Sequence, residues 1–217
     1  MRTDAAQADV TDLRIFLRKC AAAFPKEPWN VAADRAVRHA FSIFPTSRSR
    51  HGVLLKIAAL RAIWGAGVFD TYAMADHILH LQRLDKWLRR GDDRAVARIR
   101  QGHGIRPSGR RRELDLYSFA TKYCHWHRPD LYPMYDYYVD RALKRLNRWR
   151  PFTDSIGDLR EFGRLRQALD ACNRKSGLHW RGNKRLDQAF WVAGRKLSGD
   201  DPSAPDLQAA GKPPRGL

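Results

Sequence analysis

The sequence predicts an all-α protein. Apolar residues recur every three or four positions between proline and glycine breaks, as they do on one face of a helix. No segment alternates apolar and polar residues as a strand does, and no internal repeat is visible. We expect a compact multi-helix bundle of about eight helices, with two half-lobes around a cleft, in a single domain of residues 1–197. A disordered tail, residues 198–217, is expected to follow because it is rich in Pro, Gly, Ala and Asp.

The N-terminal third is predicted to hold three helices. Residues 1–10 are polar, and we expect them to be mobile and not a signal peptide, because they lack an apolar core. Asp12 is placed to cap a helix over residues 13–24, which two prolines end. A second helix is expected at 29–44, and a third at 50–64, where Ser and Thr residues precede it and glycines close it.

Two further helices are predicted before the middle of the chain. Asp70 is placed to open a fourth helix that runs to Leu88 with apolar residues at helical spacing. Gly91 interrupts the pattern, and a short basic helix is expected to end at Gln101. Residues 102–112 contain three glycines, a proline and several arginines, which predicts an exposed basic loop.

The central stretch sets a lysine and an aspartate on either side of a short connection. A largely buried helix is predicted at 118–127, and Pro129 ends it. Asp136 stands at the N-cap of the next helix, 137–149. Lys122 therefore extends from one helix and Asp136 opens the next, so we expect the two side chains to face each other across the connection. Two more helices, at 158–175 and 183–197, complete the predicted fold.

This central pattern resembles the active-site segment of helix-hairpin-helix DNA glycosylases, and most closely the 8-oxoguanine glycosylase-fold branch. The similar residues are Lys122, Pro133, Asp136, Val139 and Arg141, read as a lysine-bearing helix, a proline, and Asp-x-x-Val-x-Arg at a helix start. The resemblance implies that Lys122 attacks the sugar and that Asp136 supports cleavage of the glycosidic bond. In the alternative interpretation, Lys122 extends to solvent or pairs with a carboxylate, and Asp136 is an ordinary cap.

Aromatic residues crowd the same stretch and suit a pocket that holds a base by stacking. Most of them would equally suit a core, so we expect one or two to line the pocket and the others to pack. The candidates are Tyr123, Trp126, Tyr135, Tyr137 and Tyr138.

The charge predicts a polyanionic partner. The net charge is +18, with 41 basic against 23 acidic residues, and nucleic acid is the favoured partner over an anionic membrane. Phosphate contacts are expected in the loop and on the helix after Asp136, although both arginine groups would also suit a solvated surface. The candidate residues are Arg106, Arg110, Arg111, Arg112, Lys144, Arg145 and Arg148.

The three cysteines are widely spaced, which argues against a disulfide framework and favours a reducing cytoplasm. No metal site is expected, because Cys124, His125 and His127 lack a second Cys/His pair at zinc-like spacing. We likewise expect no cofactor and no membrane span.

We therefore favour a monomeric DNA glycosylase that flips out a modified base in double-stranded DNA and leaves an abasic site. The similarity to compact bacterial members of the superfamily favours hypermodified phage bases, such as glucosylated hydroxymethylcytosine, in anti-phage defence. The alternatives are a repair glycosylase, with or without lyase activity, for oxidised guanine, and a non-catalytic helical DNA-binding protein.

Overall fold

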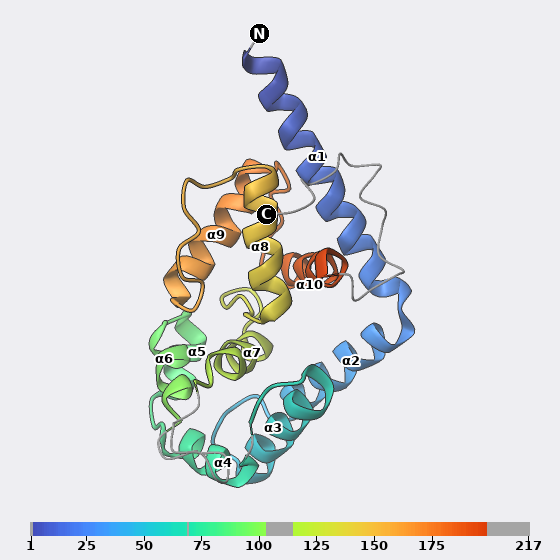
Figure 1. The fold of residues 1–217 in the computed structure, drawn as a ribbon. Coiled ribbons are helices and arrows are strands. Elements are labelled where there is room, and N and C mark those ends of the chain that lie inside the picture. The colour runs from blue at the N-terminus through green and yellow to red at the C-terminus, as the bar shows by residue number, and fades with distance from the viewer. Residues whose placement is uncertain (1, 69, 103–114, 199–217) are drawn as a thin grey trace. The chain divides into compact units, whose positions relative to one another are not determined.

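The computed structural model describes residues 2–68, 70–102 and 115–198, and this part of the chain is all helical (Figure 1). It contains ten α-helices and one short 3-10 helix, with no strand among the described residues. The all-α prediction is therefore confirmed. The chain divides into two units, one formed by residues 1–28 and 135–217 and the other by residues 29–134. The candidate residues 106 and 110–112, and most of the predicted tail, lie outside the described residues.

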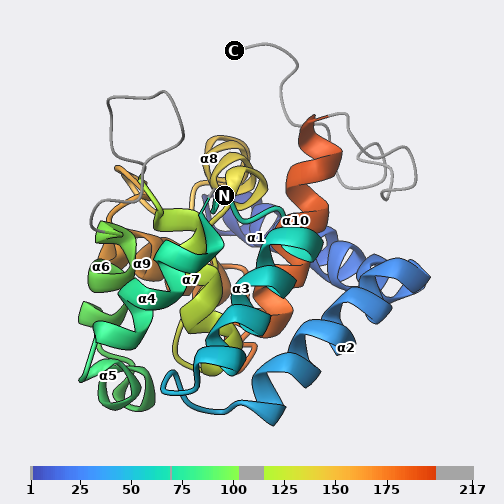
Figure 2. The ribbon, with the colours of Figure 1, turned by 90° about the horizontal axis from the view of Figure 1, so that it is seen from below.

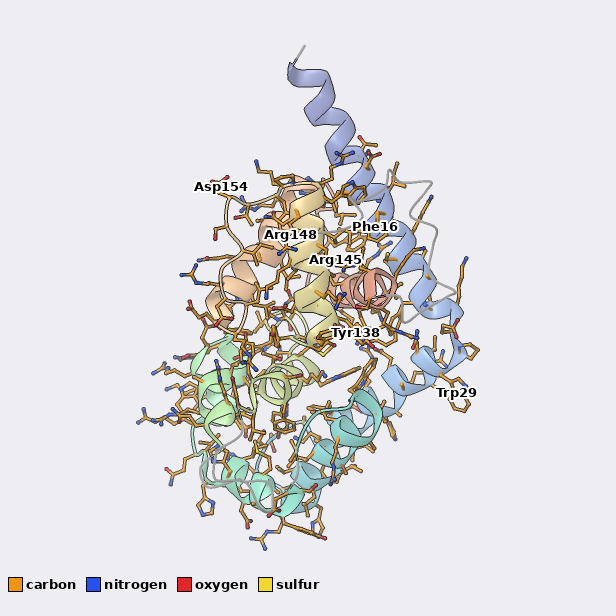
Figure 3. All side chains as sticks on the ribbon, viewed as in Figure 1. Phe16, Trp29, Tyr138, Arg145, Arg148 and Asp154 are labelled. Atoms are coloured by element: carbon orange, nitrogen blue, oxygen red, sulfur yellow. The ribbon has the colours of Figure 1, made fainter. Side chains whose placement is uncertain are left out.

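The first unit joins the two ends of the chain. Its elements are α1 (Arg2–Ala23), η1 (Phe24–Lys26), α8 (Tyr137–Trp149), α9 (Phe162–Lys175) and α10 (Lys184–Ser198). Helix α10 packs against both α1 and α8, as Figures 1 and 2 show. The α8 contact is close, because a Cβ atom on Gly194 would stand 2.2 Å from the carbonyl oxygen of Tyr138. Phe16 of α1, labelled in Figure 3, meets the Trp149 ring edge-on with centroids 5.9 Å apart.

The second unit contains the helices from α2 to α7. They are α2 (Pro28–Ile43), α3 (Arg50–Trp64), α4 (Thr71–His80), α5 (Leu84–Arg90), α6 (Arg94–Gln101) and α7 (Tyr117–His127). Helix α3 packs on α4 and α7, and α6 packs on α5 and α7. Polar caps fix two of the helix starts: Ser49 accepts a hydrogen bond from the Gly52 amide at 3.2 Å, and Asp70 accepts one from Ala73 at 2.9 Å.

Three of the predicted helices differ from the observed ones by more than two residues. The first helix begins at Arg2, so Asp12 lies inside it and instead accepts a hydrogen bond from Arg150 at 2.9 Å. The predicted fourth helix is two helices, because α4 packs on α3 whereas α5 packs on α6. Helix α9 begins at Phe162, because Asp158 bonds the Arg160 amide at 2.9 Å and holds a turn before it.

Candidate functional site

Lys122 lies on α7 with 5% of its surface exposed. Its ammonium donates a hydrogen bond to the carbonyl oxygen of Trp64 at 3.0 Å. Trp64 is the last residue of α3, where backbone carbonyls lack partners within the helix and attract positive charge. Lys122 therefore stabilises the C-terminus of α3, and its catalytic role stays a prediction.

Asp136 is the N-cap of α8, as the sequence predicted. Its carboxylate accepts a hydrogen bond from the Val139 amide at 2.9 Å, and the residue is half-buried. This bond fixes the carboxylate at the first turn of the helix. Asp136 belongs to the first unit and Lys122 to the second, so the pairing of the two side chains stays a prediction.

Two of the candidate pocket aromatics lie in the packed interior of the second unit. Tyr123 is fully buried, and its hydroxyl lies 3.0 Å from the Ser47 Oγ atom. Burial raises the pKa of this phenol well above its usual value. Trp126 is 7% exposed, and its ring lies between those of Phe41 and Trp64, with centroids 6.4 and 6.2 Å away. Both side chains are already in contact with core groups.

The other three candidate aromatics lie at the start of α8, in the first unit. Tyr137 is 60% exposed, which makes it the most accessible of the five. Tyr138, labelled in Figure 3, is half-buried against Trp191 of α10, with ring centroids 6.3 Å apart. The Tyr135 hydroxyl donates to Asp140 at 3.4 Å, and burial raises the pKa of Tyr135. Tyr137 is thus the ring best placed to stack on a base.

Helix α8 separates its apolar and basic residues onto opposite faces. The buried face carries Val139, Ala142, Leu143, Leu146 and Trp149. The other face carries Tyr137 and then basic residues at helical spacing: Arg141, Lys144, Arg145 and Arg148. Figure 3 shows Arg145 and Arg148 along this helix. We call Tyr137 and these four cations the α8 basic face.

The cations of the α8 basic face differ in how they are held. Lys144 pairs with Asp140 one turn earlier at 2.8 Å, and Arg145 bonds the carbonyl of Leu197 on α10. Arg141 lies over the Tyr137 ring at 5.7 Å and bonds its hydroxyl. Arg148 is exposed. The face therefore presents Arg145 and Arg148 to solvent, whereas the charge of Lys144 is paired with Asp140.

A second buried lysine, Lys56 on α3, was missed by the sequence reasoning. It is fully buried, and its ammonium donates to the carbonyls of Phe44 at 3.0 Å and Thr46 at 2.8 Å. A third partner is His127 Nε2 at 3.2 Å. Three N–H donors thus meet three acceptors, which satisfies an ammonium group. We call Lys56, Ser47, Tyr123 and His127 the Lys56 cluster.

Burial governs the protonation of the Lys56 cluster. It lowers the pKa of Lys56 from 10.5 to about 8, partly offset by the charge of Asp85. Burial and the neighbouring Lys56 charge also lower the pKa of His127 well below its usual value. His127 is therefore neutral at physiological pH, as an Nε2 acceptor requires. The Ser47 amide donates to Asp85 at 2.8 Å, which ties the cluster to α5.

One sequence signal did mark Lys56. It stands on the apolar face of α3, between the buried residues Val53, Ile57 and Leu60. A lysine at such a position must either extend to solvent or find buried acceptors. Its actual acceptors come from the α2–α3 connection and from α7, which sequence periodicity does not reveal.

The comparisons with known proteins point to one family. A family model named HI_0787_N, described as an N-terminal domain, matches residues 17–131, which is more than half of the chain. The chain belongs to the HI_0787_N family. A protein of Haemophilus influenzae described as an uncharacterized protein is 30% identical over 136 residues. That match covers 62% of this chain and 62% of the relative, so the chain spans less than two thirds of the relative's length. No solved structure matches the chain.

The HI_0787_N segment divides the candidate residues. It includes Lys122 and the whole Lys56 cluster, and it ends before Asp136 and the α8 basic face. Among the residues that the structure describes, no group of three His, Cys, Asp or Glu side chains is placed to hold a metal ion. No helix in the same part of the chain is long and apolar enough to cross a membrane.

Proposed function

We propose that the chain is a DNA glycosylase that removes a modified base from double-stranded DNA, and we favour hypermodified phage bases as its targets. One observation carries the proposal. Helix α8 begins with the half-buried carboxylate of Asp136, continues with the exposed Tyr137 ring, and then presents Arg141, Arg145 and Arg148 on the same face. A carboxylate, a stacking ring and phosphate-binding cations are the groups that a base-excising enzyme needs.

The chemical roles follow from these groups. The arginines bind phosphates, and Tyr137 stacks on a base that has left the duplex. As the base departs, positive charge develops on the sugar, and the carboxylate of Asp136 stabilises it through a position already fixed by the Val139 amide. Lys122 either attacks the anomeric carbon and forms a Schiff base, or orients the substrate while water attacks.

The test is an excision assay. Duplexes carrying glucosylated hydroxymethylcytosine, 8-oxoguanine or unmodified bases are incubated with the protein and treated with hot alkali, which breaks the strand at abasic sites. Asp136→Asn keeps a capping side chain and should lower excision at least ~100-fold, the scale of losing one preorganised electrostatic group. Equal rates for this variant and the wild type would remove Asp136 from the mechanism.

Borohydride trapping tests the role of Lys122. If its amine is the nucleophile, borohydride captures a covalent protein–DNA complex, and Lys122→Gln abolishes both trapping and strand nicking. If water is the nucleophile, the abasic product forms and nothing is trapped. Full excision by Lys122→Gln would exclude the residue from the reaction.

A second candidate function is non-catalytic DNA binding. The observation that favours it is that both proposed catalytic residues already have structural tasks: Lys122 bonds the end of α3 and Asp136 caps α8. In this case every duplex is bound and none becomes alkali-labile. We further propose that the protein is a monomer. We also propose a reducing cytoplasm as its location, which the three free, buried cysteines support.

A further inference from the structure

The connection between α9 and α10 concentrates positive charge. Residues 173–185 contain five lysines and arginines and no aspartate or glutamate. Four of these cations are exposed: Arg174, Lys175, Arg181 and Arg185. Within the described part of the chain, none of the four has an ion pair with a carboxylate. Like charges held this close repel one another in the folded state.

The backbone of residues 173–185, the basic connection, is held firmly in place. The Asn173 side chain donates to the carbonyl of Trp180 at 2.9 Å and accepts from its amide at 3.0 Å. Ser176 is fully buried and donates to the Cys172 carbonyl at 2.6 Å, and Leu178 is 6% exposed. His179 has a φ of 49°, which a residue other than glycine rarely adopts. The cations therefore extend from a backbone that is constrained by these hydrogen bonds.

The basic connection exposes no large apolar side chain. Leu178 is buried, and the guanidinium of Arg185 lies over the Trp180 ring, 4.6 Å from its centroid. A membrane-binding loop needs exposed apolar side chains that enter the lipid interface. A single-strand-binding surface needs exposed rings on which bases stack. The basic connection offers no such apolar side chain, and its rings are the exposed imidazole of His179 and the half-buried indole of Trp180. Its four exposed cations therefore outnumber its exposed rings and suit the phosphates of a duplex.

We propose that the basic connection binds the phosphate backbone of double-stranded DNA, without reading its sequence, as a contact separate from the α8 basic face. The inference rests on the proposed function for its choice of DNA as the partner. It adds a division of labour within the first unit. The α8 basic face carries an exposed tyrosine ring for an unstacked base, and the basic connection carries four exposed cations for the backbone.

The test compares two variants that remove equal charge. The first is Arg174→Gln with Lys175→Gln and Arg181→Gln, which leaves the Arg185–Trp180 stack intact. The control replaces three exposed cations on α5 with glutamine: Lys86, Arg89 and Arg90. Fluorescence anisotropy measures the affinity of each protein for a labelled unmodified duplex and for one strand of that duplex. Binding to phosphatidylcholine–phosphatidylserine vesicles is measured in parallel. Each measurement is repeated over a series of salt concentrations. Circular dichroism verifies that each variant is folded.

The expected result is a smaller salt dependence for the first variant alone. Each lost phosphate contact lowers the slope of log affinity against log salt by about 0.9, so three lower it by roughly 2.7. A fourfold rise in salt weakens duplex binding by both proteins. The factor by which binding weakens is then roughly 40 times smaller for the variant than for the wild type. Equal slope changes in both variants would show a diffuse charge effect and overturn the inference. Loss of vesicle or single-strand binding, with duplex binding unchanged, would overturn it as well.

This experiment separates the inference from the proposed function. The duplex carries no modified base, so binding is measured whether or not the protein excises anything. Suppose that the wild type yields no alkali-labile sites and that the first variant binds the duplex with a smaller salt slope. This result would refute the glycosylase and leave the basic connection as a DNA contact. A wild type that yields alkali-labile sites, together with a first variant whose salt slope is unchanged, would support the glycosylase and refute the DNA contact at the basic connection.

Discussion

The pH dependence of stability should report directly on Lys56. Its pKa falls from 10.5 to about 8 on folding, chiefly because burial disfavours the charged form. One pKa unit corresponds to about 1.36 kcal/mol, so the folded state disfavours the ammonium by about 3 kcal/mol. Between pH 8 and 10.5 the unfolded chain binds more protons than the folded one. The free energy of unfolding therefore rises with pH across this window because of Lys56.

Lys56→Met isolates this contribution. The methionine side chain has a similar length and cannot titrate. The variant therefore lacks the rise in the free energy of unfolding that Lys56 produces. Denaturant unfolding of both proteins at intervals from pH 7 to 10.5 gives the difference in their free energies of unfolding. We expect wild type minus variant to stay constant up to pH 8 and then to rise by about 3 kcal/mol by pH 10.5. Other titrations, such as that of buried Cys20 with its raised pKa, cancel in the difference.

A matched control is Lys86→Met, since Lys86 is an exposed lysine of the same unit. Its difference from the wild type should be flat across the same pH range. A flat difference for Lys56→Met as well would mean that the buried amine titrates as it does in the unfolded chain, and would refute the reasoning from burial.

Three further predictions concern the first unit. Gly194→Ala should destabilise the protein by roughly 1–3 kcal/mol in denaturant unfolding, because the new Cβ meets the α8 backbone at 2.2 Å. The control Gly163→Ala should not destabilise it, because nothing lies within 4 Å of the new Cβ there. Asp136→Ala should cost about 1 kcal/mol of unfolding free energy through the lost cap, and Asp136→Asn far less; equal losses would contradict the capping role. Arg145→Gln and Arg148→Gln should each lower the salt slope of duplex binding by about 0.9, and an unchanged slope would exclude phosphate contact there.

The sequence predicts a boundary well where local chemistry sets it. The helices at 50–64 and 137–149 were predicted with the bounds observed, because Ser49 and Asp136 cap their starts through their own side chains. Prediction failed where distant packing decides. The break after His80 depends on α4 packing against α3 while α5 packs against α6, and neither contact has a local signature.

The candidate residues show the same limit. An apolar helix around Lys122 predicted its burial, yet its acceptor, Trp64, lies 58 residues earlier in the chain. Tyr123 and Trp126 belonged to a cluster of aromatics that suits a pocket or a core equally well, and only the structure shows them packed in the interior. Exposure of Tyr137 likewise follows from the side of α8 that packs on α10, which the sequence does not state.

Both buried lysines of the HI_0787_N segment bind carbonyls at helix C-termini. Lys56 bonds Phe44, which follows the last residue of α2, and Lys122 bonds Trp64 at the end of α3. Their availability for chemistry differs. Lys56 is fully buried with three acceptors, whereas Lys122 is 5% exposed and among the described residues bonds one carbonyl. Lys122 can therefore release its acceptor at smaller cost, so we expect borohydride trapping to survive Lys56→Met and to be lost in Lys122→Gln. The opposite pattern would place the reactive amine in the Lys56 cluster.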